Sequence, residues 1–274
     1  MSDVPPGIDT LPAPGFDARP RTTIDFWDSQ WNQRDDRASV QRLFHARDFG
    51  RDGHFLRLMR RYAPGVFKDA AVVELGGGAS RYLVDLARHE HSRVTAIDYS
   101  DIGIRQTKEL FALHGIQGDT ILADIFEWHE ADGCFDVVVH WGLLEHFDDP
   151  APILAASARL LKPGGVLVFT MPNLAAVGAG LWRRFAPGNF SAHVYHSDES
   201  LRAAMKNVGL RSVRMFHCGP PLVRMAPAER GGLASQAANL AHALLLAGGT
   251  LAPSLYLRGH PRISNTRGFV ARKI

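Results

Sequence analysis

The sequence predicts an α/β protein in which short strands alternate with amphipathic helices. Five apolar runs have strand length, and they lie at 71–75, 93–98, 120–122, 136–140 and 166–171. Helical patterns between them lie at 79–90, 101–114 and 150–161. Strands connected by such helices form right-handed crossover units and therefore one parallel sheet. Further runs at 211–216 and 267–274 predict a sixth and a seventh strand, with a helix at 198–208 that starts after Ser197.

A helical region precedes the first strand. One apolar stripe recurs at helical spacing and consists of Phe55, Leu56, Met59 and Tyr62. Pro64 and Gly65 predict the end of that helix. Trp27 and Trp31 are four residues apart and would share a helix face.

These patterns divide the chain into three parts. We expect a disordered tail over 1–20, an N-terminal helical cap over 21–66, and a main domain over 67–274. Residues 219–266 are too many for a connection in a compact sheet, so they predict a helical insertion. Its apolar stretch, 238–257, contains His, Gly-Gly and Pro, which favours a packing helix or lid over a membrane span. Peripheral membrane contact is the alternative.

Composition limits the class of protein. The 274 residues are 46% hydrophobic and 22% charged, as in globular proteins. The net charge of +3 is too small to indicate a nucleic-acid partner. The N-terminus lacks the features of a signal peptide, and Cys134 and Cys218 lack metal-type spacing, so we expect a cytoplasmic protein without disulfides.

Three glycines follow the first strand in "VVELGGGAS", residues 72–80. A glycine in an ordered element costs roughly 0.5–1 kcal/mol relative to alanine, so three indicate a close approach to the backbone. The group that comes close to this backbone is either a ligand or a neighbouring part of the chain, packed tightly where the strand turns into the helix. A dinucleotide fingerprint requires a glycine where this chain has Arg81, which disfavours a dehydrogenase.

The arrangement resembles the class I S-adenosylmethionine-dependent methyltransferases. Glu74, Gly76 and Gly78 match the family's acid-x-G-x-G motif, and "VTAIDYS", "LADIFEW", "HWGLLEHFDDP" and "LLKPGG" follow in the family's order. The resemblance covers roughly residues 70–217. It implies S-adenosyl-L-methionine as cofactor. It also implies a Rossmann-like three-layer sandwich with a seven-stranded, mostly parallel sheet whose last strand is antiparallel.

The resemblance also implies cofactor-binding residues on the first two strands. Gly76, Gly77 and Gly78 would let the methionine part lie against bare backbone. Glu74 would accept a hydrogen bond from the cofactor's ammonium group. Asp98 would accept from both ribose hydroxyls, because one carboxylate suits a vicinal diol. The alternative for Asp98 is a cap at the end of a strand.

The adenine would lie near the third and fourth strands. Asp124 resembles the residue that accepts from the adenine amino group, with the Ile125 N–H facing a ring nitrogen. Tyr99 or Trp141 would pack on the adenine face. The alternatives are a turn acid for Asp124 and core packing for Trp141.

Candidate catalytic residues follow the fourth strand. His146, Glu145 and His140 stand near the expected methyl position, and a histidine is a suitable general base. The Glu-His pair resembles that of small-molecule methyltransferases, including the ubiquinone-pathway O-methyltransferases. Some of these bind a divalent metal through another acid three positions earlier, where this chain has Gly142, so no metal is predicted. A structural role is the alternative for His146 and the favoured one for His140.

The acceptor pocket is expected to include Trp27, Trp31, His193, Tyr195 and His196. The H-x-x-H spacing of the two histidines does not by itself specify a metal. The sequence lacks the [DNS]-P-P-[FYW] motif of amino-methylating DNA enzymes after the fourth strand. We therefore predict methyl transfer to O or N of a small molecule, such as a natural-product or quinone-like aromatic acceptor. The alternatives are a sugar or lipid-linked glycan precursor, or a regulatory protein that binds the cofactor without catalysis.

Overall fold

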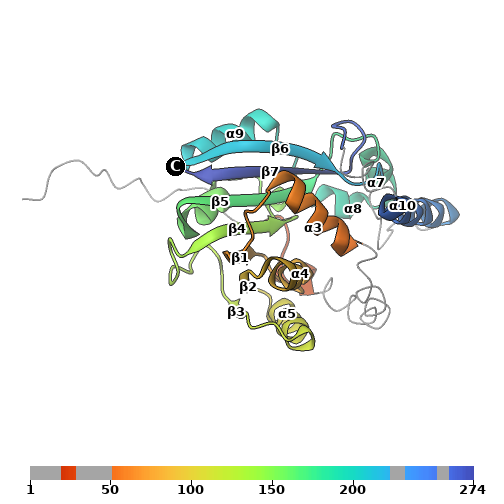
Figure 1. Cartoon of the computed structure of the whole chain (residues 1–274). Helices are drawn as coiled ribbons and strands as arrows, with labels where there is room; N and C mark the ends of the chain where they lie inside the picture. Colours follow the sequence, from red (N-terminus) through yellow and green to blue (C-terminus); the bar gives the residue numbers. More distant parts are fainter. Residues whose placement is uncertain (1–19, 29–50, 223–231, 252–258) are drawn as a thin grey trace, which may run out of the picture.

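Seven strands form one sheet in the order β3-β2-β1-β4-β5-β7-β6 (Figure 1). The computed structural model describes residues 20–28, 51–222, 232–251 and 259–274. The strands are β1 Ala71–Leu75, β2 Arg93–Asp98, β3 Asp119–Leu122, β4 Phe135–Trp141, β5 Leu161–Pro172, β6 Leu210–Cys218 and β7 Thr266–Lys273. Strands β1 to β5 pair in parallel, and β7 is antiparallel to β5 and β6. The predicted fold class is confirmed.

Helices cover both faces of the sheet. They are α3 Arg51–Tyr62, α4 Arg81–Glu90, α5 Asp101–His114, α6 Ala151–Leu160, α7 Ala179–Phe185, α8 Pro187–Ser191, α9 Asp198–Asn207 and α10 Leu233–Leu251, with the 3-10 helix η1 at Leu144–His146. One core cluster joins the sheet to α3, α4 and α5, and a second joins the opposite face to α6 and α9. Alternate residues supply the two clusters, since Val72 lies in the first and Val73 in the second.

Serine side chains begin three of these helices. The Oγ atoms of Ser80, Ser100 and Ser197 accept hydrogen bonds from backbone N–H groups in the first turns of α4, α5 and α9. Such a cap stabilises a helix by about 1 kcal/mol relative to alanine. The predicted cap at Ser197 is confirmed, and so is the end of α3 before Pro64 and Gly65, where Gly65 has a φ of +72°.

The predicted start of the fifth strand was wrong. Strand β5 begins at Leu161 instead of Val166, directly after α6. Its register shifts between Phe135 and Val137 of β4, which accommodates the Lys162–Gly165 segment. A Cβ on Gly165 would lie 2.9 Å from the Lys162 carbonyl oxygen, so only glycine fits this irregularity.

Except for its last residue, Pro20, the predicted tail lies outside the described residues, and part of the predicted cap, 29–50 with Trp31, lies outside them as well. Within the predicted insertion the structure describes α10, which projects beyond α7 and α8 (Figure 1). None of the helices in the described ranges has the length and apolar character needed to cross a bilayer. The division into cap, domain and insertion stays a prediction.

Candidate active site

The candidate site lies where the parallel strands end in their carboxyl direction. Three loops meet there: the glycine loop after β1, the turn after β2 at Asp98, and the turn after β4 that carries η1. Ligands of open α/β sheets bind at this edge, where the strand order reverses between β1 and β4.

The glycines of the loop serve different needs. Gly76 has a φ of +68°, which glycine adopts without strain. A Cβ on Gly77 would lie 3.0 Å from the Cβ of Ala96, so this glycine is required by the packing of the loop on β2. Tight packing therefore explains Gly77, whereas Gly76 serves the turn that exposes the loop.

Glu74 is buried at the end of β1, with 5% of its surface exposed. Its Oε2 accepts a 2.5 Å hydrogen bond from the hydroxyl of Ser80, which also caps α4. Burial raises the pKa of Glu74 to about 8, and the nearby Asp98 carboxylate raises this pKa further, while the Ser80 hydrogen bond lowers it. The nearby indole N–H of Trp141 also lowers this pKa.

Asp98 ties the glycine loop to the start of α5. Its Oδ2 accepts from the N–H of Gly78 and its Oδ1 from the N–H of Ser100, both at 2.8 Å. Ser100, not Asp98, provides the side-chain cap of α5. Burial raises the pKa of Asp98 to about 6, against the effect of these hydrogen bonds. The backbone of Tyr99 lowers this pKa as well, and a carboxylate can accept more hydrogen bonds than these backbone contacts, so acceptor capacity remains for a ribose hydroxyl.

Asp124, the third acid predicted to bind the cofactor, is not buried as Glu74 and Asp98 are. Asp124 is exposed two residues after β3, and its Oδ1 accepts from the N–H of Phe126 at 2.8 Å, as in an Asx turn. The carbonyl of Ile125 accepts from Arg159. Burial raises the pKa of the Tyr99 hydroxyl, and three carboxylates raise it further, those of Asp98, Asp28 and Asp124. Of the predicted adenine-side residues, Asp124 therefore lies near Tyr99.

The glycine loop, Glu74 and Asp98 together form a cofactor cradle, and this cradle fits a cationic ligand. Among the residues that the structure describes, the groups that act on the pKa values of Glu74 and Asp98 are carboxylates and hydrogen-bond donors, and none of these is a cation. A nearby positive charge stabilises ionised carboxylates and would offset the cost of burying them. S-adenosylmethionine brings a sulfonium and an ammonium group, so its chemistry matches these residues.

Trp141 packs into the core. Its ring makes edge contacts with Phe55 of α3, at a centroid distance of 4.9 Å, and with Tyr82 of α4, at 5.6 Å. These contacts favour the core-packing alternative over stacking on adenine.

His140 points to the opposite face of β4, where it is fully buried and stacks on Phe169 at 4.8 Å. Burial lowers the pKa of His140 to about 3, which favours the structural role.

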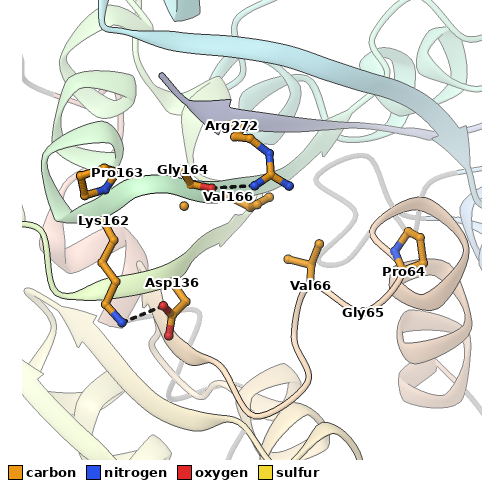
Figure 2. Close-up of a pocket in the computed structure, with 10 residues that line it drawn as sticks. Pro64, Gly65, Val66, Asp136, Lys162, Pro163, Gly164, Val166 and Arg272 are labelled. Atoms are coloured by element: carbon orange, nitrogen blue, oxygen red, sulfur yellow. Dashed lines mark hydrogen bonds and ion pairs between the residues drawn. The ribbon is translucent and has the colours of Figure 1, made fainter.

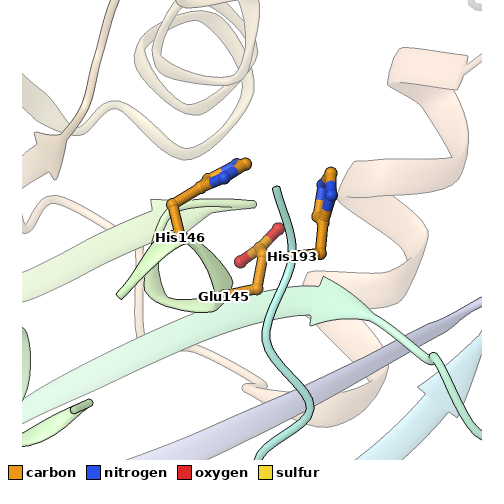
Figure 3. Close-up of side chains that lie close together, drawn as sticks. All are labelled: Glu145, His146 and His193. Atoms are coloured by element: carbon orange, nitrogen blue, oxygen red, sulfur yellow. The ribbon is translucent and has the colours of Figure 1, made fainter. Parts of the chain in front are cut away.

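Glu145, His146 and His193 form a second polar cluster (Figure 3). One donor atom from each lies within 4.8 Å of the others. Gly142 makes room for the cluster, since it has a φ of +71° and a Cβ there would lie 3.2 Å from Oε1 of Glu145. Burial raises the pKa of Glu145 to about 8, and Arg267 lowers it.

Both rings of the cluster are held by backbone carbonyls. The Nδ1 atom of His146 lies 3.0 Å from the oxygen of Ala192, and that of His193 lies 2.7 Å from the oxygen of Asn189. Burial lowers the pKa of His146 to about 3, and it also lowers the pKa of His193. Both imidazoles are therefore neutral near pH 7. The contact with Ala192 matches the structural alternative for His146 and still leaves Nε2 available.

The remaining predicted pocket residues separate. Trp27 makes an edge contact with His146 at 5.1 Å, so it closes over the cluster. His196 is buried with Nε2 3.0 Å from the oxygen of Phe147, which fixes the loop away from the cluster. Tyr195 is 53% exposed and lies under the guanidinium of Arg267. Of the H-x-x-H pair, His193 alone joins the cluster.

Sequence reasoning missed the contacts of the N-terminal segment. The N–H of Arg21 donates to the carbonyl of His146 at 2.7 Å, and its guanidinium donates to Asp148 and to the Ser191 carbonyl. Asp28 accepts from the hydroxyl of Ser100 at 2.5 Å. Arg21 and Asp148 are 127 residues apart in the sequence, and no local pattern marks such a pair.

A pocket of about 390 Å³ lies elsewhere, beside the turn after α3 and the β5 irregularity (Figure 2). Its charged side chains are already engaged. Lys162 pairs with Asp136 at 2.7 Å, and Arg272 donates to the Gly164 carbonyl at 2.8 Å. Because it adjoins the start of β4 instead of its carboxyl end, this pocket is not the candidate active site.

Comparisons with known proteins agree with this geometry. A family model described as a methyltransferase domain matches residues 50–214. The chain belongs to the class I S-adenosylmethionine-dependent methyltransferases, an enzyme family whose cofactor is S-adenosylmethionine.

One curated relative is a ubiquinone biosynthesis O-methyltransferase of Xanthomonas euvesicatoria pv. vesicatoria. It is 32% identical over 151 residues, which are 52% of this chain and 63% of the relative. The match thus spans less than two thirds of that relative's length.

Two solved structures share the fold. A chain of the complex between the Haloferax volcanii Trm112 methyltransferase activator and the putative methyltransferase has a TM-score of 0.57 at 18% identity, covering 93% of this chain and 98% of that one. The [4+2]-cyclase SpnF has a TM-score of 0.55 at 17% identity, covering 81% and 80%. Since one neighbour is a cyclase, the fold alone does not define the reaction.

Proposed function

We propose that this chain transfers a methyl group from S-adenosylmethionine to an oxygen of a small, quinone-like aromatic acceptor. The observation that carries the proposal is the cluster of Glu145, His146 and His193 at the carboxyl edge of the sheet, next to the cofactor cradle. The names of the ubiquinone-pathway relatives support oxygen as the methylated atom. Nitrogen in a similar acceptor is the nearest variant of this reaction.

The cofactor, when bound, supplies an electrophilic methyl group. The residues of the cradle align it: the glycine loop exposes backbone, and Glu74 and Asp98 hold its polar ends. Alignment of donor and acceptor provides much of the rate increase in such a displacement. Trp27 and the buried cluster exclude water from the acceptor side.

The cluster provides the proton acceptor. Nδ1 of each histidine faces a carbonyl oxygen, which only accepts hydrogen bonds, so each Nδ1 carries the proton and each Nε2 has a free lone pair. With a pKa of about 3, His146 is a weak base. His193 is more exposed than His146, so we assign His193 as the base that accepts the proton of the acceptor hydroxyl. We assign His146 the role of shaping the pocket.

The first experiment is calorimetric titration of the purified chain with S-adenosylmethionine, S-adenosylhomocysteine and NADH. We expect micromolar binding of the first two and none of NADH. Formation of S-adenosylhomocysteine is then measured with catechols and hydroquinones, and with sugars as the comparison class. Turnover with sugars alone would overturn the assignment of an aromatic acceptor. Cofactor binding without turnover in any acceptor class would favour the regulatory alternative.

A second candidate is an acceptor carried by a membrane, such as a lipid-linked glycan precursor. Helix α10 contains no charged residue, and its side chains of Leu233, Leu240 and Leu244 are 85%, 61% and 63% exposed. Their spacing places them along one side of the helix. Flotation of the chain with lipid vesicles, and its loss in Leu240→Ser/Leu244→Ser, would support this candidate.

A further inference from the structure

The buried cluster has the composition of a metal site. Its three donor atoms come from η1 and from the loop after α8, and they lie within 4.8 Å of one another. Zinc ligands stand about 2.0–2.2 Å from the ion, so small side-chain rotations would bring these atoms into a first coordination sphere. We propose that Glu145, His146 and His193 bind a transition-metal ion of the Zn²⁺ class and discriminate against Mg²⁺.

The orientation of the two rings supports this site. The carbonyls of Ala192 and Asn189 hold the protonated Nδ1 atoms of His146 and His193, which leaves the Nε2 lone pairs for an ion. Metal-bound histidines commonly donate their other ring N–H to such a carbonyl, because that contact fixes the tautomer and the ring. Edge contacts with Trp27 and Trp182 restrain the rings further.

Glu145 supplies an independent observation. Its side chain is 2% exposed, and within the described part of the chain its Oε2 has no hydrogen-bond partner. A buried carboxyl oxygen without a partner is unfavourable, and a bound cation would satisfy it. The nearby Arg267 does not take this place: its two Nη atoms donate to Asp198 and to the His196 carbonyl, and its Nε forms no hydrogen bond within the described part of the chain.

The donor set determines which ions fit. Mg²⁺ prefers an octahedral set of oxygen ligands, whereas imidazole nitrogen suits Zn²⁺, Cu²⁺ and Ni²⁺. Gly142 stands where metal-binding methyltransferases of the ubiquinone type carry an acid, and a side chain there would crowd Oε1 of Glu145. His193, from another element, provides a nitrogen donor instead.

Three protein ligands leave one position of a tetrahedral ion open. An acceptor hydroxyl in that position would lose its proton to solvent, because the bound ion occupies the Nε2 lone pair of His193 that accepts this proton in the ion-free chain. This use of the ion rests on the proposed function, but binding of the ion does not. The test therefore measures ion binding in the absence of cofactor and acceptor.

The experiment uses the full chain without a purification tag, after removal of metals with a chelator. Calorimetry with Zn²⁺ and with Mg²⁺ gives stoichiometry and affinity, and Co²⁺ gives a visible absorption spectrum sensitive to coordination. We expect one Zn²⁺ per chain, bound at least a hundredfold more tightly than Mg²⁺. His193→Gln should weaken Zn²⁺ binding at least tenfold. His89→Gln, on α4 outside the cluster, should leave it unchanged.

The proposal is overturned if the chain binds no Zn²⁺, if His193→Gln binds it unchanged, or if Mg²⁺ binds equally well. Circular dichroism checks that the variant folds. If it does not, zinc X-ray absorption of the unmodified chain replaces it: two imidazole ligands are expected, and fewer than two would refute the site. Binding of S-adenosylmethionine, measured separately, distinguishes failure of this site from failure of the proposed function.

Discussion

The cofactor side and the acceptor side of the site are built in different ways. On the cofactor side, short segments of consecutive elements contact one another: Glu74 pairs with Ser80, and Asp98 with Gly78, at separations of 6 and 20 residues. On the acceptor side, Arg21 reaches Asp148 and Ser191 across 127 and 170 residues. The first region is therefore readable as a motif, whereas the second exists only in the folded chain.

The two regions also differ in charge. The cradle concentrates carboxylates, and within the described ranges no cation acts on the pKa values of Glu74 and Asp98. The acceptor side combines one buried acid with two neutral imidazoles. We infer that the first region attracts a cationic ligand and that the second handles protons or metal ions. The following changes test this difference, from the largest expected effect to the smallest.

Asp98→Ala should affect the cofactor side most. It removes the acceptor for the Gly78 and Ser100 N–H groups, each of which costs about 1–3 kcal/mol when buried without a partner. Affinity for S-adenosylmethionine should fall at least tenfold, about 1.4 kcal/mol, by calorimetry. Asp119→Ala, exposed on β3, is the control and should bind normally. Unchanged affinity in Asp98→Ala would remove the ribose assignment.

The pH dependence of cofactor affinity tests the charge of the cradle. The folded pKa of Glu74, about 8, exceeds the ordinary value of 4.5, so protonation stabilises the folded chain. That stability is complete below pH 4.5 and is lost as the pH rises toward 8. A bound cationic ligand favours the ionised forms of Glu74 and Asp98, and so it offsets the unfavourable free energy of burying their charges.

Affinity for S-adenosylmethionine should therefore rise on the order of tenfold between about pH 5 and pH 7, an interval in which the cofactor's amino group stays protonated. Titration calorimetry at each pH measures this rise. Glu74→Gln should flatten it by removing one of the two acids and leaving Asp98. A steep, unchanged profile in the variant would show that Glu74 does not face the cofactor.

Gly142→Ala tests the space beside Glu145. A side chain at a φ of +71° costs roughly 1–2 kcal/mol, and this Cβ would also press on Oε1 of Glu145. Gly133→Ala is a matched control, because Gly133 has a φ of +67° and a Cβ there would meet nothing within 4 Å. Urea denaturation should show a larger loss for Gly142→Ala. Equal losses would mean that the Glu145 contact is unimportant.

Arg21→Ala should have the smallest effect on stability. The side chains of Arg21 and Asp148 are 42% and 68% exposed, and such surface ion pairs contribute about 1 kcal/mol or less. We expect a small change in unfolding free energy together with a higher KM for the acceptor and normal cofactor affinity. A loss of cofactor affinity instead would show that the contacts of Arg21 serve the cofactor side, where Asp28 already accepts from Ser100.

The sequence by itself determined the order of the seven strands along the chain, the helices between the first five of them, the serine cap of α9 and the position of the glycine loop, whereas α7 and α8 were not predicted. These features depend on residue periodicity and on turn residues that lie within a few positions of one another. The start of β5 was missed because Gly165 permits an irregularity inside the strand, whereas the "KPGG" pattern predicted only the end of a helix.

Only the tertiary structure decided which candidate residues lie together and which contacts each of them makes. His193 and His196 were both expected in the acceptor pocket, yet His193 joins Glu145 and His146 while His196 fixes a loop. Trp141 matched a motif but packs between α3 and α4. Local sequence patterns predict which secondary structure forms, because helices and strands depend on residues that are close in sequence. Which side chains meet depends on burial and on partners from distant elements, and these are set only when the chain has folded.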